Sequence, residues 1–415
     1  MSADTAENTI QVVGGGVAGL NCAVHLHRRS LKFHLIEASD GLGGRMRTDV
    51  VDGFRLDRGF QVFQSAYPEA KAALDYDALD LQPLVPGALV RKNSKWMRMV
   101  DPIRRPSSAL STIFNSVGSL NDRWKLAKLL WDVKWAPMEK FTTADGDKST
   151  YELLSVDYSF SESFLKSFLV PWLSGIFLET ELATSANFFR FVMKTLSSGP
   201  ISYPRAGIQA IPDQLARQIP AESIELNCPV KSVQPNTIEL SNGQRRAGSV
   251  VLAVPMHQSS QLAGPSAQDR GSKSTTCIYF AADRPPIAEP ILMLNGEHDG
   301  PVNHVFVMTS ASPDLAPVGK SLISVNLVGD GAYAQDTVRN QLRSWFGTMA
   351  SEWRELAVYR ILQALPKQPA CFWTPAPIRE SNGTVLCGDY CSSASLQGAL
   401  LSGRIAAEQI ALVTN

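Results

Sequence analysis

The sequence predicts an α/β fold in which a doubly wound domain with a parallel sheet carries an inserted mixed α+β domain. A glycine-rich turn lies between a strand and a helix near the N-terminus, and a strand followed by a small-residue helix closes the chain. Between them the patterning changes from helical to β-rich. At 415 residues the chain exceeds what one hydrophobic core usually organises, so we expect two domains.

The N-terminal pattern predicts a βαβ unit. A β-branched run at 10–13 precedes the glycine turn, and a helix over 20–28 is followed by a second strand over 33–36. Another helix, opened by Pro68, is expected over 67–74. This order is the beginning of a doubly wound sheet.

The central part of the chain is expected to be mostly helical and then β-rich. Apolar residues recur at helical spacing from 110 to 196, with Pro137 and Pro171 as breaks. Asn242–Gly243 predicts a hairpin turn leading into a strand over 249–254. The other later elements are expected as helices at 212–218, 333–346 and 396–413, and as strands at 224–226, 230–233, 237–240, 277–280, 304–308, 322–328 and 384–387.

These elements divide into two interleaved groups. We assign residues 1–90, 203–265 and 375–415 to the doubly wound domain. Residues 91–202 and 266–374 form the inserted domain, which combines a helical part with an antiparallel sheet. The doubly wound domain is therefore assembled from three separated segments.

Composition excludes several classes of function. Lys+Arg and Asp+Glu both number 39, so no global field favours a nucleic-acid partner. The six cysteines contain no CxxC pair and histidines are few, which argues against a metal site and favours reduced, mostly buried thiols, including Cys387 and Cys391. The N-terminus lacks a signal peptide, and the apolar run 168–178 is too short to span a bilayer. We expect a cytoplasmic protein.

The glycine turn carries the strongest signal for a cofactor. Gly14 permits the tight turn, Gly16 lets the backbone approach a pyrophosphate, and Gly19 lets the helix pack closely on the strand. Glu37 ends the second strand, where a carboxylate can accept hydrogen bonds from the ribose hydroxyls of an adenosine. Strand, turn and acid together predict an FAD/NAD(P)-binding Rossmann-like domain.

The segment after Glu37 favours FAD over NAD. An NAD domain would continue into another helix, whereas this chain continues into the loop Gly43-Gly44-Arg45. Here the sequence resembles the flavin-containing amine oxidase and phytoene desaturase superfamily. In that family the two glycines bring backbone amides next to the pyrophosphate and the arginine adds positive charge, whereas Arg47 is interpreted as a surface residue.

The resemblance extends to further segments. It implies that Gly59, with Phe60 and Gln61, passes beside the flavin ring, although core packing explains Phe60 equally well. The stretch 203–212 matches the family's return into the cofactor domain, and Val230 matches the strand that contacts the adenine. No cysteine lies near 359–366, close to where monoamine oxidases attach their flavin, so we expect non-covalent FAD.

The closing segment resembles the family's second motif. Gly388–Asp389 follows a short strand and precedes a helix rich in small residues. In the family the acid holds the ribityl chain or a phosphate-bound network, and the helix N-terminus stabilises negative charge at the reduced ring. The residues expected to contact FAD are Gly14, Gly16, Val17, Ala18, Gly19, Glu37, Ala38, Gly43, Gly44, Arg45, Gly59, Phe60, Gln61, Val230, Gly388, Asp389, Leu396, Gln397 and Ala399.

The expected chemistry is hydride transfer between a small-molecule substrate and the flavin. The apolar helical middle, and an amine cage of which only Trp373 and Tyr390 could be remnants, favour an apolar, isoprenoid- or carotenoid-like substrate. The alternatives are an amine or polyamine oxidase that releases hydrogen peroxide, and a protein that holds FAD without turnover. No catalytic acid or base stands out; Lys320 could match the lysine near the flavin of some amine oxidases, but it also fits a solvent turn.

One amphipathic stretch has two interpretations. In 124–135 and just before it, Leu120, Trp124, Ala127 and Trp131 stand at helical spacing with lysines between them. We interpret it as a helix that packs this stripe on its own domain while the lysines extend outwards. A peripheral membrane contact or an entrance for an apolar substrate is the alternative.

Overall fold

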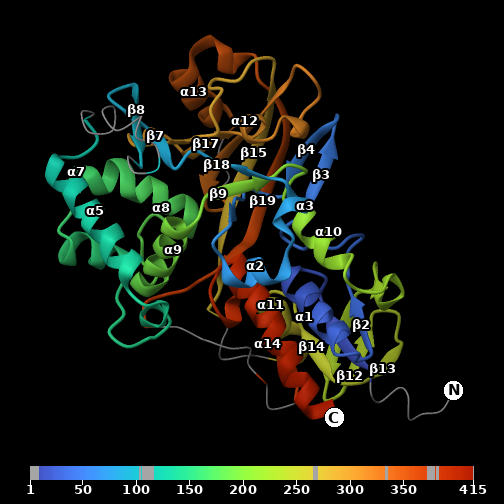
Figure 1. Ribbon diagram of the computed structural model, residues 1–415. Coiled ribbons are helices and arrows are strands. Elements are labelled where there is room, and N and C mark those ends of the chain that lie inside the picture. Colours follow the sequence, from blue (N-terminus) through green and yellow to red (C-terminus); the bar gives the residue numbers. More distant parts are fainter. Residues whose placement is uncertain are drawn as a thin grey trace.

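The computed structural model describes residues 9–101, 104, 116–264, 270–331, 335–371, 379 and 383–414. Two sheets organise the fold: a parallel sheet near the two termini and a larger mixed sheet above it, with a helical region at one side (Figure 1). This architecture confirms the predicted α/β fold class.

The smaller sheet has five parallel strands and brings the two ends of the chain together. In spatial order the strands are β10 (Ile224–Glu225), β2 (Phe33–Ile36), β1 (Ile10–Val13), β14 (Val250–Leu252) and β20 (Val385–Leu386). Since β1 is central and the strands are parallel, the turns after β1, β2 and β20 open at the same edge.

Different layers cover the two faces of this sheet. Alternate side chains of β1 point to opposite faces: Ile10 and Val12 pack with the helices, and Val13 packs with the small sheet. The helical layer consists of α1 (Val17–Arg28), α10 (Ala210–Ala216) and α14 (Leu396–Thr414). The other layer consists of β11 (Val230–Gln234), β12 (Thr237–Leu240), β13 (Arg245–Ala247) and α11 (Met256–Ala263).

The larger sheet has seven strands, paired antiparallel except for β16 and β7, which are parallel. In spatial order they are β19 (Arg354–Pro366), β15 (Ser272–Ala282), β18 (Ser321–Val328), β17 (Val302–Val307), β16 (Leu292–Leu294), β7 (Gly87–Lys92) and β8 (Lys95–Val100). Helix α13 (Gln335–Phe346) packs on one face. The domain boundary expected near residue 90 falls inside β7.

The expected helical region is present over its described part, whereas residues 105–115 lie outside the described ones. Its helices are α5 (Leu120–Trp135), α6 (Thr150–Glu152), α7 (Glu162–Phe164), α8 (Val170–Phe177) and α9 (Ala186–Ser198). Shorter elements between the layers are β3 (Thr48–Val51), β4 (Phe54–Asp57), β5 (Phe63–Gln64), α2 (Pro68–Ala73), α3 (Tyr76–Leu79), β6 (Leu81–Pro83), β9 (Ile201–Pro204) and α12 (Met308–Ala311).

The hairpin at Asn242–Gly243 forms, but with a different partner strand. The turn joins β12 to β13, and the expected strand over 249–254 is β14 of the parallel sheet. The expectation was wrong because Val250, Val251 and Leu252 are buried on both faces, which is typical of a central parallel strand.

The orientation of α5 also differs from the expected one. Leu129 and Val133 face the core, whereas Leu120, Trp124 and Trp131 are 68%, 64% and 65% exposed. The helix carries two apolar stripes, so periodicity alone could not tell which one packs. Throughout the ranges described here, every helix is too short or too polar to cross a bilayer.

Candidate functional site

The glycine turn between β1 and α1 is shaped by close backbone contacts. Gly14 has φ +111°, and a Cβ on Gly19 would lie 2.0 Å from the carbonyl oxygen of Gly14. Gly16, by contrast, faces open space: a Cβ there would meet no described atom within 4 Å. Gly16 is also the N-cap residue of α1. Because glycine has no side chain that could cap the helix, the first backbone amides of α1 stay available for an anion.

Glu37, at the end of β2, holds the neighbouring loops. Its Oε2 accepts from Gly15 N at 2.7 Å, and its Oε1 accepts from Ser39 N at 2.9 Å. The backbone carbonyl of Glu37 accepts from Cys228 N at 2.9 Å, which places the start of β11, with Val230, beside the 37–39 segment that contains Ala38. A carboxylate has acceptor sites left for ribose hydroxyls after these bonds.

The Gly43-Gly44-Arg45 loop lies directly on the glycine turn. Gly43 N donates to the Gly15 carbonyl at 2.8 Å, and Gly43 pairs with Gly16 as an isolated bridge. Gly44 has φ +57°, and its Cβ would lie 3.3 Å from the Gly16 Cα. The loop therefore needs both glycines to reach this position.

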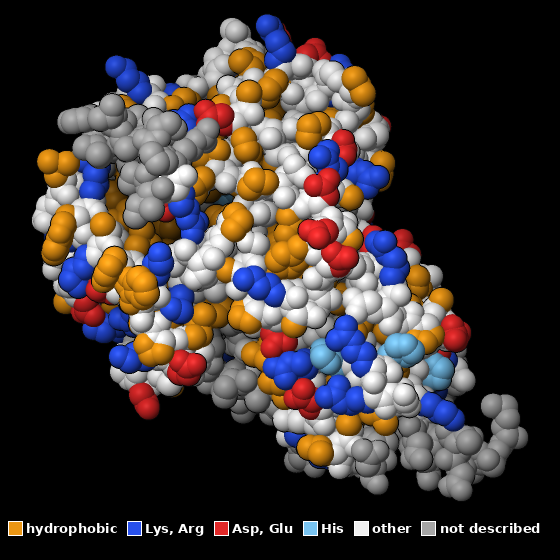
Figure 2. Space-filling view, viewed as in Figure 1, with side chains coloured by type: hydrophobic (Ala, Val, Ile, Leu, Met, Phe, Trp, Pro, Cys, Tyr) orange, Lys and Arg blue, Asp and Glu red, His pale blue; other side chains and the backbone are white. Residues whose placement is uncertain are grey.

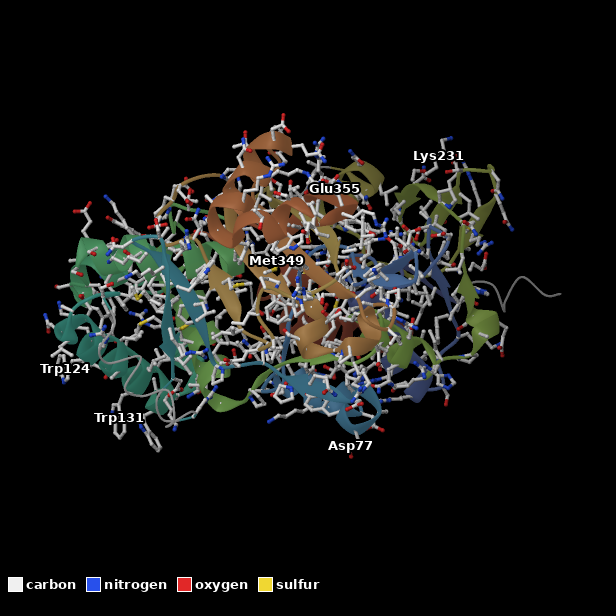
Figure 3. The ribbon with its side chains drawn as sticks, turned by 90° about the horizontal axis from the view of Figure 1, so that it is seen from above. Asp77, Trp124, Trp131, Lys231, Met349 and Glu355 are labelled. Carbon is white, nitrogen blue, oxygen red and sulfur yellow. The ribbon has the colours of Figure 1, made fainter. Side chains whose placement is uncertain are left out.

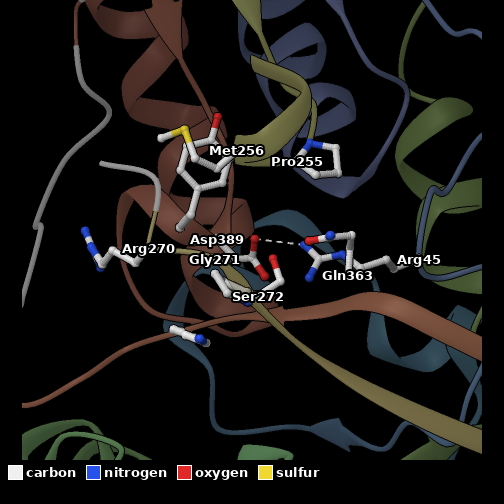
Figure 4. A pocket seen from close by; sticks show the side chains of 11 residues that line it. Arg45, Pro255, Met256, Arg270, Gly271, Ser272, Gln363 and Asp389 are labelled. Carbon is white, nitrogen blue, oxygen red and sulfur yellow. Dashed lines mark ion pairs between the residues drawn. The ribbon is translucent and has the colours of Figure 1, made fainter. Parts of the chain in front are cut away.

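Arg45 and Asp389 connect the two ends of the chain. Their ion pair is 2.8 Å long, and the Asp389 side chain is only 7% exposed. Arg45 also donates to the Ala364 carbonyl at 2.9 Å and accepts from Gln61 Nε2 through its own carbonyl at 2.8 Å. Figure 4 shows this pair inside a pocket whose other lining residues include Pro255, Met256, Arg270, Ser272 and Gln363.

The closing motif places α14 against α1. Gly388 N donates to Ser402 Oγ at 3.0 Å, which ties the start of the motif to the second turn of α14. A Cβ on Gly403 would lie 2.4 Å from the Ala18 carbonyl oxygen, so the two helices touch at backbone distance. Val17 is buried at the start of α1.

The first turn of α14 also meets the segment that begins α2. Gln397 Oε1 accepts from Glu69 N at 3.0 Å, and Ala399 N donates to the Ser395 carbonyl at 3.0 Å. Leu396, the first residue of α14, packs against the core beneath the helices. The structure thus brings Leu396, Gln397 and Ala399 to one helix end beside α2.

The Gly59-Phe60-Gln61 segment lies between the two sheets. Gly59 has φ +98°, and its Cβ would lie 2.6 Å from Ile361 Cδ1 of β19. The ring of Phe60 contacts His304 and Phe306 of β17 at centroid distances of 5.1 and 5.4 Å. Phe60 therefore packs on the larger sheet, as the core alternative expects.

Asp57, just before this segment, is a functional candidate that sequence reasoning did not single out. Its buried carboxylate accepts from Thr48 Oγ1 at 2.6 Å, from Tyr203 Oη, and from Ile208 N at 3.2 Å. Burial raises the pKa of Asp57 to about 6, although these three hydrogen bonds favour the charged form. Asp57 thereby fixes the Gly59 loop to the return segment 203–208.

Lys320 does not fit the role considered for it. It lies in a turn, is about half exposed and pairs with Asp283 at 2.6 Å, so it is a surface residue. A buried lysine lies elsewhere: Lys273 of β15 pairs with Glu179 at 2.8 Å, with side chains 9% and 13% exposed. Burial lowers the pKa of Lys273, while Glu179 opposes that shift.

Tyr390, considered as a remnant of an amine cage, is among the residues that line the pocket of Figure 4. Its ring is buried in the cluster between the parallel sheet and the small sheet, and its hydroxyl lies 3.4 Å from Ser259 Oγ. Trp373 lies outside the described residues. Arg47 forms an ion pair with Asp40 at 2.8 Å, but only the Asp40 side chain is at the surface: it is 75% exposed, whereas the Arg47 side chain is 15% exposed.

Fold and site together define a class. An uncapped helix behind a glycine turn, an acid at the end of β2, and a closing motif paired with Arg45 suit a dinucleotide with a large second half. The family model of the flavin containing amine oxidoreductases matches residues 17–411. The chain belongs to this family, which implies a flavin cofactor and confirms the predicted flavin-dependent oxidoreductase.

Individual relatives are similar over shorter stretches. Protoporphyrinogen oxidase 2 of Arabidopsis thaliana is 25% identical over 263 residues, covering 55% of this chain and 51% of that protein. The carotenoid 3,4-desaturase of Haloarcula japonica is 41% identical over 56 residues, covering 14% and 11%. The chain thus spans about half the length of the plant relative that it matches.

Solved structures extend the likeness to the whole fold. The putative protoporphyrinogen oxidase from Exiguobacterium sp. 255-15 superposes with a TM-score of 0.72 and 16% identity, covering 100% of both chains. At this identity the likeness concerns the fold alone.

Proposed function

We propose that this chain holds FAD non-covalently and uses it to oxidise an apolar, isoprenoid- or carotenoid-like small molecule by hydride transfer. The observation that carries the proposal is the Arg45–Asp389 pair, because it closes a single site from the two ends of the chain. The similarity of one segment to a carotenoid desaturase supports the choice of substrate class.

The residues of this chain would hold the cofactor at several points. The first amides of α1 would bind the pyrophosphate above Gly16, and Glu37 would accept from the adenosine ribose. The N-terminus of α14 and Asp389 would face the flavin half. When bound, the flavin supplies the two-electron acceptor that side chains lack.

The placement of the cysteines supports non-covalent binding. Cys387 is a buried thiol whose Sγ lies 4.0 Å from Ser402 Oγ, and burial raises its pKa to about 12, so it stays protonated. Cys371 lies at the surface, where its Sγ donates to the Asp147 carbonyl at 3.2 Å. Neither cysteine belongs to the residues that line the pocket of Figure 4.

A buried aromatic cluster supports an apolar substrate. Phe177, Phe188, Phe191 and Tyr67 make consecutive ring contacts, with centroids 5.8, 6.1 and 6.2 Å apart. Burial raises the pKa of Tyr67, while a hydrogen bond to Ser395 opposes the shift. This buried cluster therefore extends from the helical region to Tyr67, beside the residue that precedes α14, and makes these surroundings apolar.

The test is anaerobic reduction of the purified holoprotein. In one sample, acid precipitation of the protein should release FAD into the supernatant. In a second, intact sample kept free of oxygen, an isoprenoid or carotenoid substrate dispersed in detergent should bleach the visible absorption band of the flavin. Retention of the flavin in the protein pellet would contradict non-covalent binding.

An amine oxidase remains the second candidate, because the family model itself is named for amines. A polyamine panel should neither bleach the flavin nor produce hydrogen peroxide in air. Rapid bleaching by amines, with apolar compounds inert, would replace the proposed substrate class. A flavin that no member of either panel reduces would favour the third interpretation, FAD binding without turnover.

A further inference from the structure

The outer face of α5 presents three tryptophans to solvent. Trp124, Trp131 and Trp135 are 64%, 65% and 64% exposed, and Leu120 on the same face is 68% exposed. Figure 3 shows Trp124 and Trp131 extending from the helix away from the rest of the molecule. One exposed apolar side chain needs no explanation, but a contiguous group on one helix face marks an interaction surface. We call these four residues the tryptophan face.

The exposure follows from a fixed orientation of the helix. Ser119 caps α5 in a capping box with Asp122, and the Asp122 carboxylate also accepts from Ser161 N at 2.8 Å. At the other end, Lys194 of α9 donates to the carbonyls of Lys134 and Ala136 at 2.9 and 2.7 Å. Rotation of the tryptophans into the core would break both attachments.

The charges on α5 itself are mostly positive, although Asp157 of a neighbouring segment lines a pocket together with Trp124 and Lys125. The helix carries four basic residues, Arg123, Lys125, Lys128 and Lys134, against Asp122 and Asp132. Asp122 is buried at the cap and Asp132 is paired with Lys128 at 2.6 Å. The Lys134 ammonium lies 5.7 Å from the Trp135 ring centroid. Figure 2 shows hydrophobic side chains interspersed with lysine and arginine over this helical flank.

We propose that the tryptophan face binds the surface of a lipid bilayer that contains anionic lipids. Tryptophan favours the interface because its ring is apolar and its N–H needs a polar partner, and neighbouring lysines attract anionic headgroups. With its axis in the membrane plane, α5 would bury this face while its opposite face stays on the core. A second copy of the chain is a poorer occupant, since two-fold pairing through this face would set the same lysines against each other.

This membrane contact goes beyond the proposed redox function and does not depend on it. Helix α9 packs against α5 and carries Phe188 and Phe191 of the aromatic cluster.

The test is co-sedimentation of the FAD-loaded protein with vesicles of phosphatidylcholine, with and without phosphatidylglycerol. Wild type should bind the anionic vesicles more tightly, and its tryptophan emission should shift to the blue. The double variant Trp131→Ser/Trp135→Ser should bind at least about tenfold more weakly. Lys134→Gln should weaken binding by about fivefold.

Matched controls separate this effect from damage to the fold. Leu412→Ser removes an apolar side chain that is 83% exposed on α14, and Lys231→Gln removes a lysine from the far end of the molecule (Figure 3). Both should bind vesicles like wild type, and all variants should keep the flavin spectrum and melting temperature.

Two outcomes would overturn the proposal: equal vesicle binding by wild type and the double tryptophan variant, or no binding by wild type. A wild-type dimer that the double variant converts to monomers, without vesicle binding, would assign the face to a second copy instead. None of these results would affect the flavin reaction, which is assayed in detergent.

Discussion

Helices α1 and α5 differ in how the unpaired backbone amides at their N-termini are satisfied. Helix α1 is buried along most of its length. It begins at Gly16 without a side-chain cap, so its first backbone amides face the open space at the edge of the sheet. Helix α5 begins with a complete capping box and buries one face only. The comparison teaches that α1 leaves backbone amides open to solvent, as the proposed cofactor site requires, whereas α5 exposes side chains, as the proposed membrane contact requires.

The largest effect is expected from Gly19→Val in α1. The new Cβ would collide with the Gly14 carbonyl oxygen at 2.0 Å, and neither backbone segment can retreat from the sheet. We expect a loss of about 3 kcal/mol or more in the free energy of unfolding. Chemical denaturation measures it.

The matched control is Ala127→Val on the exposed side of α5. It should cost less than about 1 kcal/mol, because only the helix propensity changes. Similar losses in the free energy of unfolding for Gly19→Val and Ala127→Val would contradict the difference between a helix packed at backbone distance and a helix with an exposed face.

The next largest effect concerns the ion pair between Arg45 and Asp389, which joins the two ends of the chain. Arg45→Met should cost about 2 kcal/mol, because it leaves the nearly buried Asp389 carboxylate without its partner. Adding Asp389→Asn to this variant should restore part of the loss. Arg47→Met should cost less than about 1 kcal/mol, since its partner Asp40 is largely exposed. A double-mutant cycle by chemical denaturation tests the coupling, and its absence would contradict the junction.

Asp57, which holds the Gly59 loop, should make the stability of the fold depend on pH. Its pKa of about 6 in the folded protein lies above the value of about 4 in the unfolded chain, so protonation stabilises the fold. This contribution is fully present below pH ~4 and is lost as the pH rises through about 6. Relative to Asp57→Asn, wild type should gain about 2 kcal/mol between pH 7 and pH 4.5. Parallel pH profiles for the two proteins would disprove the shift.

The smallest effect is expected from Ser119→Ala at the start of α5. Loss of the capping hydrogen bond should cost about 1 kcal/mol. Thermal unfolding measures the loss, while the flavin content should stay unchanged because α5 lies outside the cofactor site. Loss of flavin in this variant would mean that the two helices are coupled.

The cofactor side of the molecule could be predicted from sequence because its constraints are local. Gly14, Gly16 and Gly19 lie within six residues: Gly14 and Gly19 approach other backbone atoms too closely for a Cβ, whereas Gly16 leaves open space at the start of α1. The pairing of Arg45 with Asp389 was not predicted, but both residues were singled out by motifs.

Other features depend on contacts between distant segments. Asp57 collects partners from residues 48, 203 and 208, which no spacing rule connects. Strand β19 was not predicted, because its Leu, Ala, Glu, Gln and Arg residues fit a helix as well as an edge strand. The predicted orientation of α5 was wrong because the helix has two apolar stripes, and only packing against the rest of the protein determines which stripe is buried.

The most direct test of the flavin site is the FAD content of Gly16→Val, compared with wild type at equal concentration of folded protein. In this variant the added Cβ lies in the open space at the start of α1, where it would meet no described atom within 4 Å. Wild type should carry one FAD per chain, and the variant should melt normally but bind FAD at least about tenfold more weakly. A wild type that takes up no flavin, or a variant that binds it equally well, would contradict the account.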